Sequence, residues 1–134
     1  MTRQKYRENA FLLLFEASFR EDTPDELFAL AEEIGEMELN DKLRRFVRGV
    51  IQDASFLDTL ISSYSPKRAL NRIARTNLIL LRMAIYEIRN DPDVPVNVVV
   101  SEAVRLSEIY AAPEDTAFIN GILGQYVRNR GGQS

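Results

Sequence analysis

The sequence predicts an all-α protein of about seven helices, arranged in two packed helical sub-bundles. Two observations carry this prediction. Apolar residues recur every three or four positions along most of the chain. The intervening segments are short and rich in residues that start or stop helices. We find no convincing strand and no internal repeat. We expect residues 1–134 to form one domain, with sub-bundles over about 1–63 and 64–130.

The first two helices are indicated by one apolar stripe and by one set of capping signals. Residues 4 to about 19 carry apolar groups at helical spacing, at Ala10, Phe11, Leu14 and Phe15. Thr23 is followed by Pro24 and Glu26, which suits a helix start with a capping box. Gly35 is placed as the C-terminal stop of that second helix.

The longest periodic pattern follows Asn40, which is positioned to cap a helix. Its apolar stripe runs for roughly five turns at the helical period. The stripe comprises Leu43, Phe46, Val47, Val50, Ile51, Ala54, Leu57 and Ile61. Asp58 is the one polar residue where the stripe had room to widen. We therefore expect a single continuous helix from Asn40 to about Ile61.

Four further helices are predicted in the C-terminal half. Ser65-Pro66 opens a short one, and Leu78–Ile88 is apolar over a wide arc, which indicates a central helix. Asn90–Pro92 ends that helix and Pro95 starts the next. The run VNVVV after Pro95 also has strand propensity, but the length of the pattern favours a helix. Pro113 opens the last helix.

The composition removes several classes of catalytic and metal site. The chain has no cysteine and no histidine, which excludes disulfides, thiolate metal sites and Ser-His triads. One carboxylate pair stays open, Glu87 and Glu102 on adjacent predicted helices. An ion pair with Arg82 or Arg105 is the preferred explanation. We expect no catalytic residue and no metal.

No segment has the length of a membrane span. The longest wholly apolar run, Ala10–Phe15, is also too short for the core of a signal peptide. Nothing approaches the roughly 20 apolar residues that a spanning helix needs. We expect a soluble, cytoplasmic protein with no membrane partner.

Charge is unevenly distributed along the chain, although the net charge is only -3. Glu21–Asp41 holds nine acids and no base, and Tyr64–Arg82 holds five bases and no acid. Arg3, Lys5 and Arg7 lie at a helix start, where the helix dipole disfavours bases. These bases therefore indicate a role other than stability.

Two interpretations stay open for each charged region. The acidic stretch is either a solvated face or a docking face for a basic partner. The basic residues are either surface charge or phosphate contacts, with Tyr6 or Phe118 available to stack unpaired bases. Phe118 also fits a core position on its own helical stripe. From charge alone, the surface interpretation is preferred.

Several motifs nevertheless resemble the signature of the NusB family of bacterial transcription antitermination factors. The matching elements are LRMAIYEI at Leu81–Ile88, DVP at Asp93–Pro95, SEAVRL at Ser101–Leu106 and FINGIL at Phe118–Leu123. The N-terminal KYRENAFLLLFE is similar to the family's basic first helix. The resemblance covers essentially the whole chain, in order and with similar spacing.

This resemblance implies an all-α, non-catalytic protein without a cofactor. Such a protein binds single-stranded boxA RNA of ribosomal RNA leader transcripts together with NusE, a small-subunit ribosomal protein. It works with other Nus factors in an RNA polymerase antitermination complex. The implied RNA-binding residues are Arg3, Lys5, Arg7, Asp115, Phe118 and Asn120. The implied NusE-facing residue is Glu87.

Two other functions remain as alternatives. Similar helical domains accompany ribosomal RNA methyltransferases, so the chain is alternatively an accessory domain that acts with a separate enzyme. A third interpretation is a protein-only scaffold that works through Glu21–Asp41. The role of the basic segment Lys67–Arg75 stays open at this point.

Overall fold

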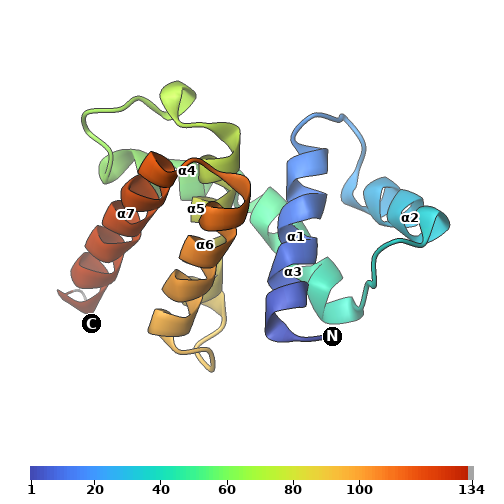
Figure 1. Ribbon diagram of the computed structural model, residues 1–134. Coiled ribbons are helices and arrows are strands. Elements are labelled where there is room, and N and C mark those ends of the chain that lie inside the picture. Colours follow the sequence, from blue (N-terminus) through green and yellow to red (C-terminus); the bar gives the residue numbers. More distant parts are fainter. Residues whose placement is uncertain (133–134) are drawn as a thin grey trace. The chain divides into compact units, whose positions relative to one another are not determined.

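The computed structural model describes residues 1–132, and its described part is all-α, as the sequence predicts (Figure 1). Seven α-helices and one short 3₁₀ helix, η1, make up the regular structure of these residues, and none of them forms a strand. The chain divides into two compact units, Met1–Gln52 and the residues from Asp53 onward. Each unit has an apolar core of its own.

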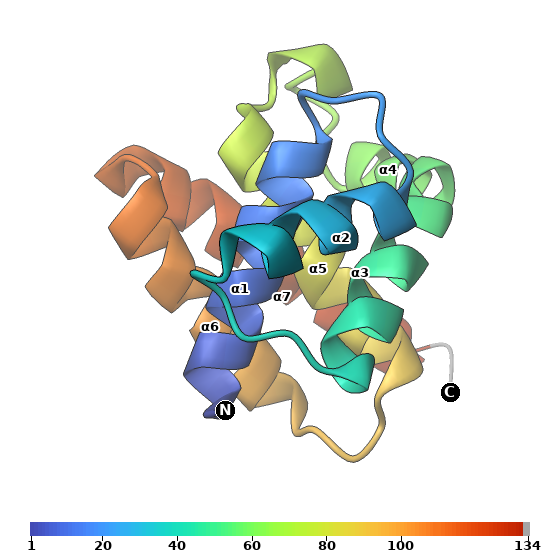
Figure 2. The ribbon, with the colours of Figure 1, turned by 90° about the vertical axis from the view of Figure 1, so that its right-hand side faces the viewer.

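The first unit consists of α1 (Arg3–Ala17), α2 (Pro24–Ile34) and α3 (Asp41–Gln52). All three helices pack on one another, and α2 faces the viewer in Figure 2. The core of this unit is formed by Ala10, Phe11, Leu14, Leu27, Phe28, Leu43, Val47 and Val50. This core includes most of the apolar residues that the first two sequence patterns singled out.

The capping signals of α2 and α3 act as the sequence predicts. The Thr23 hydroxyl accepts from the Glu26 amide at 3.2 Å, and the Glu26 carboxylate accepts from the Thr23 amide at 3.0 Å. Pro24 occupies the first turn of α2. Gly35 ends the helix with a φ of 75°, a left-handed conformation that suits glycine. Asn40 Oδ1 accepts from the Leu43 amide at 2.8 Å.

The second unit consists of α4 (Ala54–Ser63), η1 (Leu70–Arg72), α5 (Arg75–Asn90), α6 (Val96–Tyr110) and α7 (Pro113–Gly132). Helix α5 contacts α4, α6 and α7, so it is the central helix that its wide apolar arc predicts. The VNVVV segment is helical, as the continuation of its pattern predicts. The core of this unit includes Leu57, Ile61, Leu80, Leu81, Ile85, Leu106, Ile119 and Leu123.

The prediction of one continuous helix from Asn40 to Ile61 is wrong. The helix breaks at Asp53, whose φ of -92° and ψ of 6° leave the helical region. The apolar residues before the break lie in the core of the first unit, and Leu57 and Ile61 lie in that of the second. The division between the units therefore falls earlier than the boundary near residue 63 that the sequence suggested.

The prediction of a short helix that begins at Ser65-Pro66 is also wrong. A turn forms there, in which the Ser65 hydroxyl donates to the Arg68 carbonyl oxygen at 2.9 Å. Only Leu70–Arg72 is helical, as a single 3₁₀ turn. The segment between α4 and α5 is consequently a long connection with its basic side chains turned outward. Among the described helices, none is long and apolar enough to cross a membrane.

Candidate nucleic-acid interface

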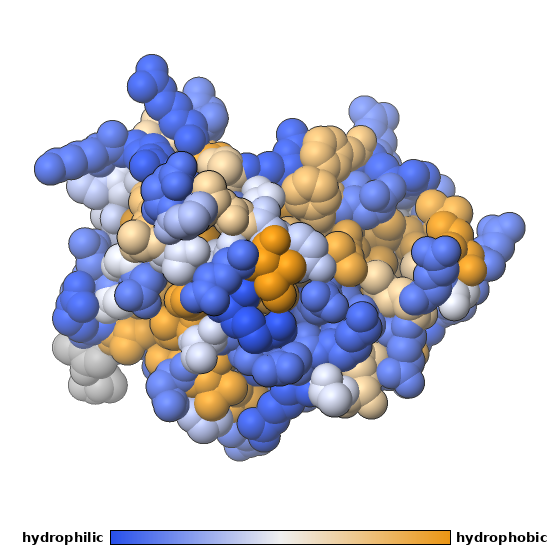
Figure 3. Space-filling view, viewed as in Figure 1, coloured by the Kyte–Doolittle hydropathy of each residue, from blue (hydrophilic) through white to orange (hydrophobic). Residues whose placement is uncertain are grey.

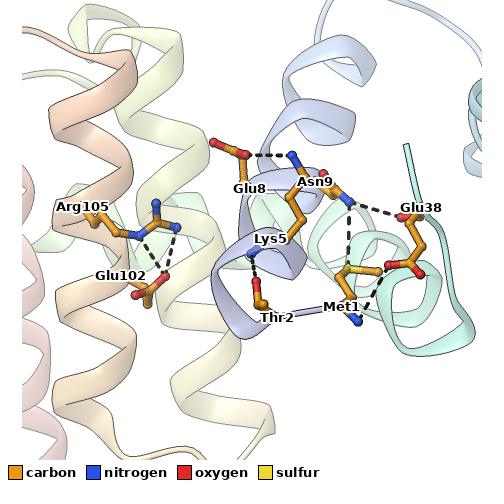
Figure 4. A network of polar contacts seen from close by, with 8 residues as sticks. All are labelled: Met1, Thr2, Lys5, Glu8, Asn9, Glu38, Glu102 and Arg105. Atoms are coloured by element: carbon orange, nitrogen blue, oxygen red, sulfur yellow. Dashed lines mark hydrogen bonds and ion pairs between the residues drawn. The ribbon is translucent and has the colours of Figure 1, made fainter. Parts of the chain in front are cut away.

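The first candidate element is the N-terminal turn of α1. The Thr2 hydroxyl accepts from the Lys5 amide at 3.0 Å, and this cap starts the helix at Arg3 (Figure 4). Arg3 and Lys5 are both exposed. The Lys5 ammonium lies 3.3 Å from a carboxylate oxygen of Glu8. This exposed pair neutralises part of the Lys5 charge and adds little stability.

Arg7 differs from its two basic neighbours because its side chain is only 4% exposed. Its Nη1 donates to the Arg3 carbonyl oxygen at 3.4 Å, one turn earlier on the same helix. Such burial does not leave the guanidinium open to a phosphate. Lys5, two positions away from both arginines, points in another direction. The first turn therefore presents Arg3 and Lys5 at the surface, and Arg7 supports the helix start from inside.

Tyr6, the aromatic residue beside these bases, packs against other residues of the first unit. Its ring lies 5.7 Å from that of Phe46, centroid to centroid, and the Lys42 ammonium lies 5.0 Å over it. The Tyr6 side chain is half-buried. These contacts occupy ring surface that an unpaired base would need for stacking.

The second candidate element is the first half of α7. Phe118 is half-buried, whereas the next residue, Ile119, is fully buried in the core. The guanidinium carbon of Arg68 lies 4.2 Å from the Phe118 ring centroid, a cation–π geometry. Phe118 is therefore outside the main core stripe, which removes the core explanation that the sequence left open. Arg68 and Phe118 place a positive charge against an aromatic ring, a combination of the kind that unpaired bases and phosphates contact.

The other two α7 residues take different positions around the helix. The Asp115 carboxylate accepts from the Ala112 amide at 3.3 Å, so it fixes the start of α7. Asp115 and Phe118 are three residues apart and share a face. Asn120 is exposed but lies two positions from Phe118, on another face. The structure thus brings Asp115 and Phe118 together and leaves Asn120 apart from both.

Arg68 is a candidate that the residue-by-residue comparison with the family missed. It belongs to the basic segment Lys67–Arg75, whose four bases are all exposed. These bases are Lys67, Arg68, Arg72 and Arg75. The absence of acids from Tyr64 to Arg82 was the only available signal, and it did not point to Phe118. The cation–π contact is what connects this segment with α7.

The carboxylates considered for catalysis or partner binding are placed differently. Glu87, on α5, is 6% exposed, which argues against direct contact of its carboxylate with another protein. Glu102 pairs with Arg105 within α6 at 3.1 Å (Figure 4), which confirms the ion-pair explanation for this residue. Among the described residues there is no group of three or more potential metal-binding Asp or Glu side chains.

Comparison with known proteins identifies the family. The family model described as "NusB family" matches residues 4–128. The chain belongs to the NusB family. It is 34% identical over 131 residues to the transcription antitermination protein NusB of Clostridium acetobutylicum, covering 96% of this chain and 97% of that protein.

Two solved structures have the same fold as this NusB-family chain. T. maritima NusB is 32% identical, with a TM-score of 0.81 and coverage of 93% of this chain and 89% of the other. A structure of the antitermination factors NusB and NusE in complex with dsRNA is 23% identical, with a TM-score of 0.79. That match covers 92% of this chain and 93% of the other. At this identity it is evidence for the fold alone.

Proposed function

We propose that this NusB-family chain is a transcription antitermination factor that binds single-stranded boxA-type RNA of ribosomal RNA leader transcripts together with NusE. The observation that carries the proposal is the family match over residues 4–128. Relatives matched over nearly their full length carry the name transcription antitermination protein NusB. This full-length match favours the antitermination factor over an accessory domain of a methyltransferase.

The proposed role is non-catalytic and cytoplasmic, within an RNA polymerase antitermination complex that contains other Nus factors. Binding alone performs it, because the chain has to hold RNA and protein together rather than change a covalent bond. The absence of histidine and cysteine from the sequence supports this view, since it removes the commonest general base and the thiol nucleophile.

In the second unit, we assign RNA contact to Phe118 and Arg68. The Arg68 guanidinium covers one face of the half-buried Phe118 ring, and an unpaired base stacks on the exposed surface of this pair. Base–aromatic stacking of this kind contributes about 1–3 kcal/mol. The Arg68 guanidinium, already held over the ring, pairs with a neighbouring phosphate. Asp115 acts indirectly, because it fixes the helix start from which Phe118 projects.

In the first unit, we assign phosphate contact to Arg3 and Lys5, the exposed bases of the first turn of α1. Arg7 positions that turn rather than touching RNA. NusE raises the affinity by adding contacts of its own. The burial of Glu87 means that a different, exposed surface of the chain receives NusE.

The experiment measures the affinity of the full chain for a boxA-type single strand, with and without NusE, over a range of salt concentrations. Each phosphate contact adds about 0.7 to the slope of log affinity against log salt for a single strand. Arg3→Ala with Lys5→Ala should lower both the affinity and this slope. Arg68→Ala should lower the affinity more than Arg68→Lys, because lysine keeps the charge.

The matched control removes two exposed arginines at the far end of α7, Arg128→Ala with Arg130→Ala, and should leave binding nearly unchanged. A double-stranded RNA of the same sequence serves as a competitor. If the RNA affinity changes neither with salt concentration nor with any of these substitutions, the electrostatic model is wrong. A clear preference for the duplex contradicts the assignment of single-stranded RNA.

A further inference from the structure

An open apolar groove lies between α1 and α2 in the first unit, away from the bases of the first turn. It has a volume of about 350 Å³. Its walls include Leu12 and Phe15 from α1, Leu30 and Ile34 from α2, and Met37 from the following loop. Ile34 is 59% exposed and Leu12 is 36% exposed. Large apolar side chains therefore remain in contact with water at the mouth of the groove.

Local sequence explains why the groove stays open. Helix α2 ends at Ile34, and the left-handed Gly35 turns the chain so that Glu36 and Met37 line one end of the groove. Ile34 stays 59% exposed beside this turn. Figure 3 shows apolar surface over the C-terminal part of α2, surrounded by hydrophilic side chains. A polar rim around a small apolar centre is the usual form of a protein-binding site.

The rim of this groove is negatively charged. Elsewhere in the acidic stretch, the arginines of α3 neutralise carboxylates: Arg44 pairs with Glu32 and Asp41, and Arg48 pairs with Asp25. The groove carboxylates are different. Glu36, from the loop after α2, and Glu16, from α1, both line the groove.

Glu36 is exposed and has no cation partner among the described residues. Glu16, which also lines the groove, has only an exposed pair with Arg20 at 3.4 Å. An exposed pair of this kind exchanges readily for another partner. The groove thus offers apolar surface together with uncompensated negative charge.

We propose that this groove binds an amphipathic helix of a protein partner, which inserts apolar side chains and flanks them with lysines or arginines. Helix-in-groove recognition needs apolar anchors at i, i+3 or i+4, and i+7, and the groove provides a narrow apolar track for them. RNA and anionic lipid surfaces are repelled by the same carboxylates. A second copy in a symmetric dimer brings an equally acidic rim against this one.

Binding at this groove is independent of RNA binding, because its lining residues are separate from those assigned to RNA. It assigns to the acidic stretch the docking role that the sequence left open. Contacts of this kind let one chain hold RNA and a further protein at the same time.

The test uses the full chain and a synthetic helical peptide of about four turns, with leucines at i, i+3 and i+7 and lysines at the other exposed positions. Binding is followed by peptide fluorescence anisotropy and by amide chemical-shift mapping. One control peptide has glutamates in place of the lysines, and another has scrambled leucines. The lysine peptide should bind, with shifts confined to α1, α2 and Met37, and both controls should bind about tenfold or more weakly.

Two groove variants and one matched variant separate the contributions. Ile34→Asp changes an exposed side chain and should weaken peptide binding about tenfold. Glu36→Lys reverses a carboxylate that lines the groove and should weaken binding several-fold, and more at low salt. Glu108→Lys is the matched control, because it reverses an exposed acid on α6 in the second unit. It should leave peptide binding unchanged.

The proposal is overturned if the lysine and glutamate peptides bind equally well, or if the chemical-shift changes lie outside the groove. It is also overturned if the wild-type chain binds no peptide but self-associates, and Ile34→Asp abolishes that self-association. RNA affinity is measured on the same variants and should not change with Ile34→Asp. A wild-type chain that binds the peptide but not boxA-type RNA refutes the proposed function and leaves this inference standing. A wild-type chain that binds boxA-type RNA but not the peptide refutes the proposal for the groove and leaves the proposed function standing.

Discussion

Arg82 of α5 holds both carboxylate oxygens of Asp58 on α4. The Nε–Oδ1 distance is 2.7 Å and the Nη2–Oδ2 distance is 2.8 Å. The two side chains are only 22% and 18% exposed. This bidentate pair joins α4 to the central helix of the second unit, and it accounts for an acid beside an otherwise apolar stripe.

Loss of the Asp58–Arg82 pair should destabilise the second unit. Asp58→Ala leaves the half-buried Arg82 guanidinium without its partner, and we expect the free energy of unfolding to fall by about 1–3 kcal/mol. Denaturant unfolding measures this. Asp58→Ala with Arg82→Ala should cost less than the sum of the single changes. As a control, Glu16→Ala removes an exposed ion pair and should change stability little. Additive single changes would show that the pair is not coupled.

A second prediction concerns two buried asparagines with different surroundings. Asn77 is fully buried, and neither atom of its amide has a hydrogen-bond partner among the described residues. Asn77→Leu, similar in size, should therefore raise the free energy of unfolding by about 1–2 kcal/mol. Asn9 is equally buried, but its Nδ2 donates to the Glu38 carbonyl oxygen at 3.2 Å. Asn9→Leu should destabilise, and a loss of stability in both variants contradicts the argument.

A third prediction concerns pH. Burial raises the pKa of Tyr86 above its ordinary value of 10.0, and the negative charge of Asp53 raises this pKa further. The folded chain thus holds the phenolic proton more tightly than the unfolded chain does. The resulting stabilisation is complete below the ordinary pKa and is lost as pH rises through the raised pKa.

Unfolding experiments at alkaline pH test this with Tyr86→Phe as the matched variant. The wild-type chain should lose stability more steeply than the variant as pH rises beyond 10.0. The two should run parallel at neutral pH, where Tyr86 is protonated in both states. Identical slopes over the whole alkaline range would show that Tyr86 titrates normally.

A fourth prediction separates backbone strain from steric contact at Gly35. A Cβ at this position meets nothing nearer than the Glu32 carbonyl oxygen at 4.0 Å. The cost of Gly35→Ala therefore comes from the φ of 75°, and we expect a loss of about 1–2 kcal/mol. Gly35→Asn should cost less, because asparagine adopts this conformation more readily. Equal losses for alanine and asparagine would point to a lost contact instead.

Those parts of the fold that depend on neighbours in sequence could be predicted from sequence. The Thr23 capping box and the Gly35 stop involve residues within four positions, so the pattern contains all the necessary information. The break at Asp53, by contrast, could not be predicted from the residues next to it in the sequence. Apolar periodicity indicates that one face of a helix is buried, but it does not indicate in which core. The apolar residues before the break pack in the core of the first unit, and those after it pack in the core of the second.

In the candidate site too, features set by nearby residues could be predicted from the sequence, and features set by packing could not. The exposure of Arg3 and Lys5 agrees with a basic first turn, whereas the burial of Arg7 and Glu87 is set by packing that a motif does not report. The contact of Arg68 with α7 joins residues far apart in the chain, from a segment without regular periodicity. Only the three-dimensional structure reveals such a pairing.

The last prediction concerns Gly121, an exposed glycine inside α7. A Cβ at Gly121 meets no atom within 4 Å, so the fold itself has no need of glycine here. Glycine in a helix costs roughly 0.5–1 kcal/mol relative to alanine, and Gly121→Ala should therefore stabilise the chain by about that amount. Gly121 lies three residues after Phe118, on the face that we assign to RNA. The added methyl group should hinder close approach of the RNA and weaken binding.

The prediction is thus a gain of stability together with a loss of RNA affinity, measured by denaturant unfolding and by boxA-type RNA titration on the same protein. Gly124→Ala is the matched control, because it lies further along α7 and away from the face of Phe118. Within 4 Å, a Cβ at Gly124 meets only Nη1 at the end of the long Arg128 side chain, at 3.3 Å. It should leave RNA affinity unchanged. If Gly121→Ala gains stability and binds RNA as tightly as the wild type, RNA does not approach this face of α7.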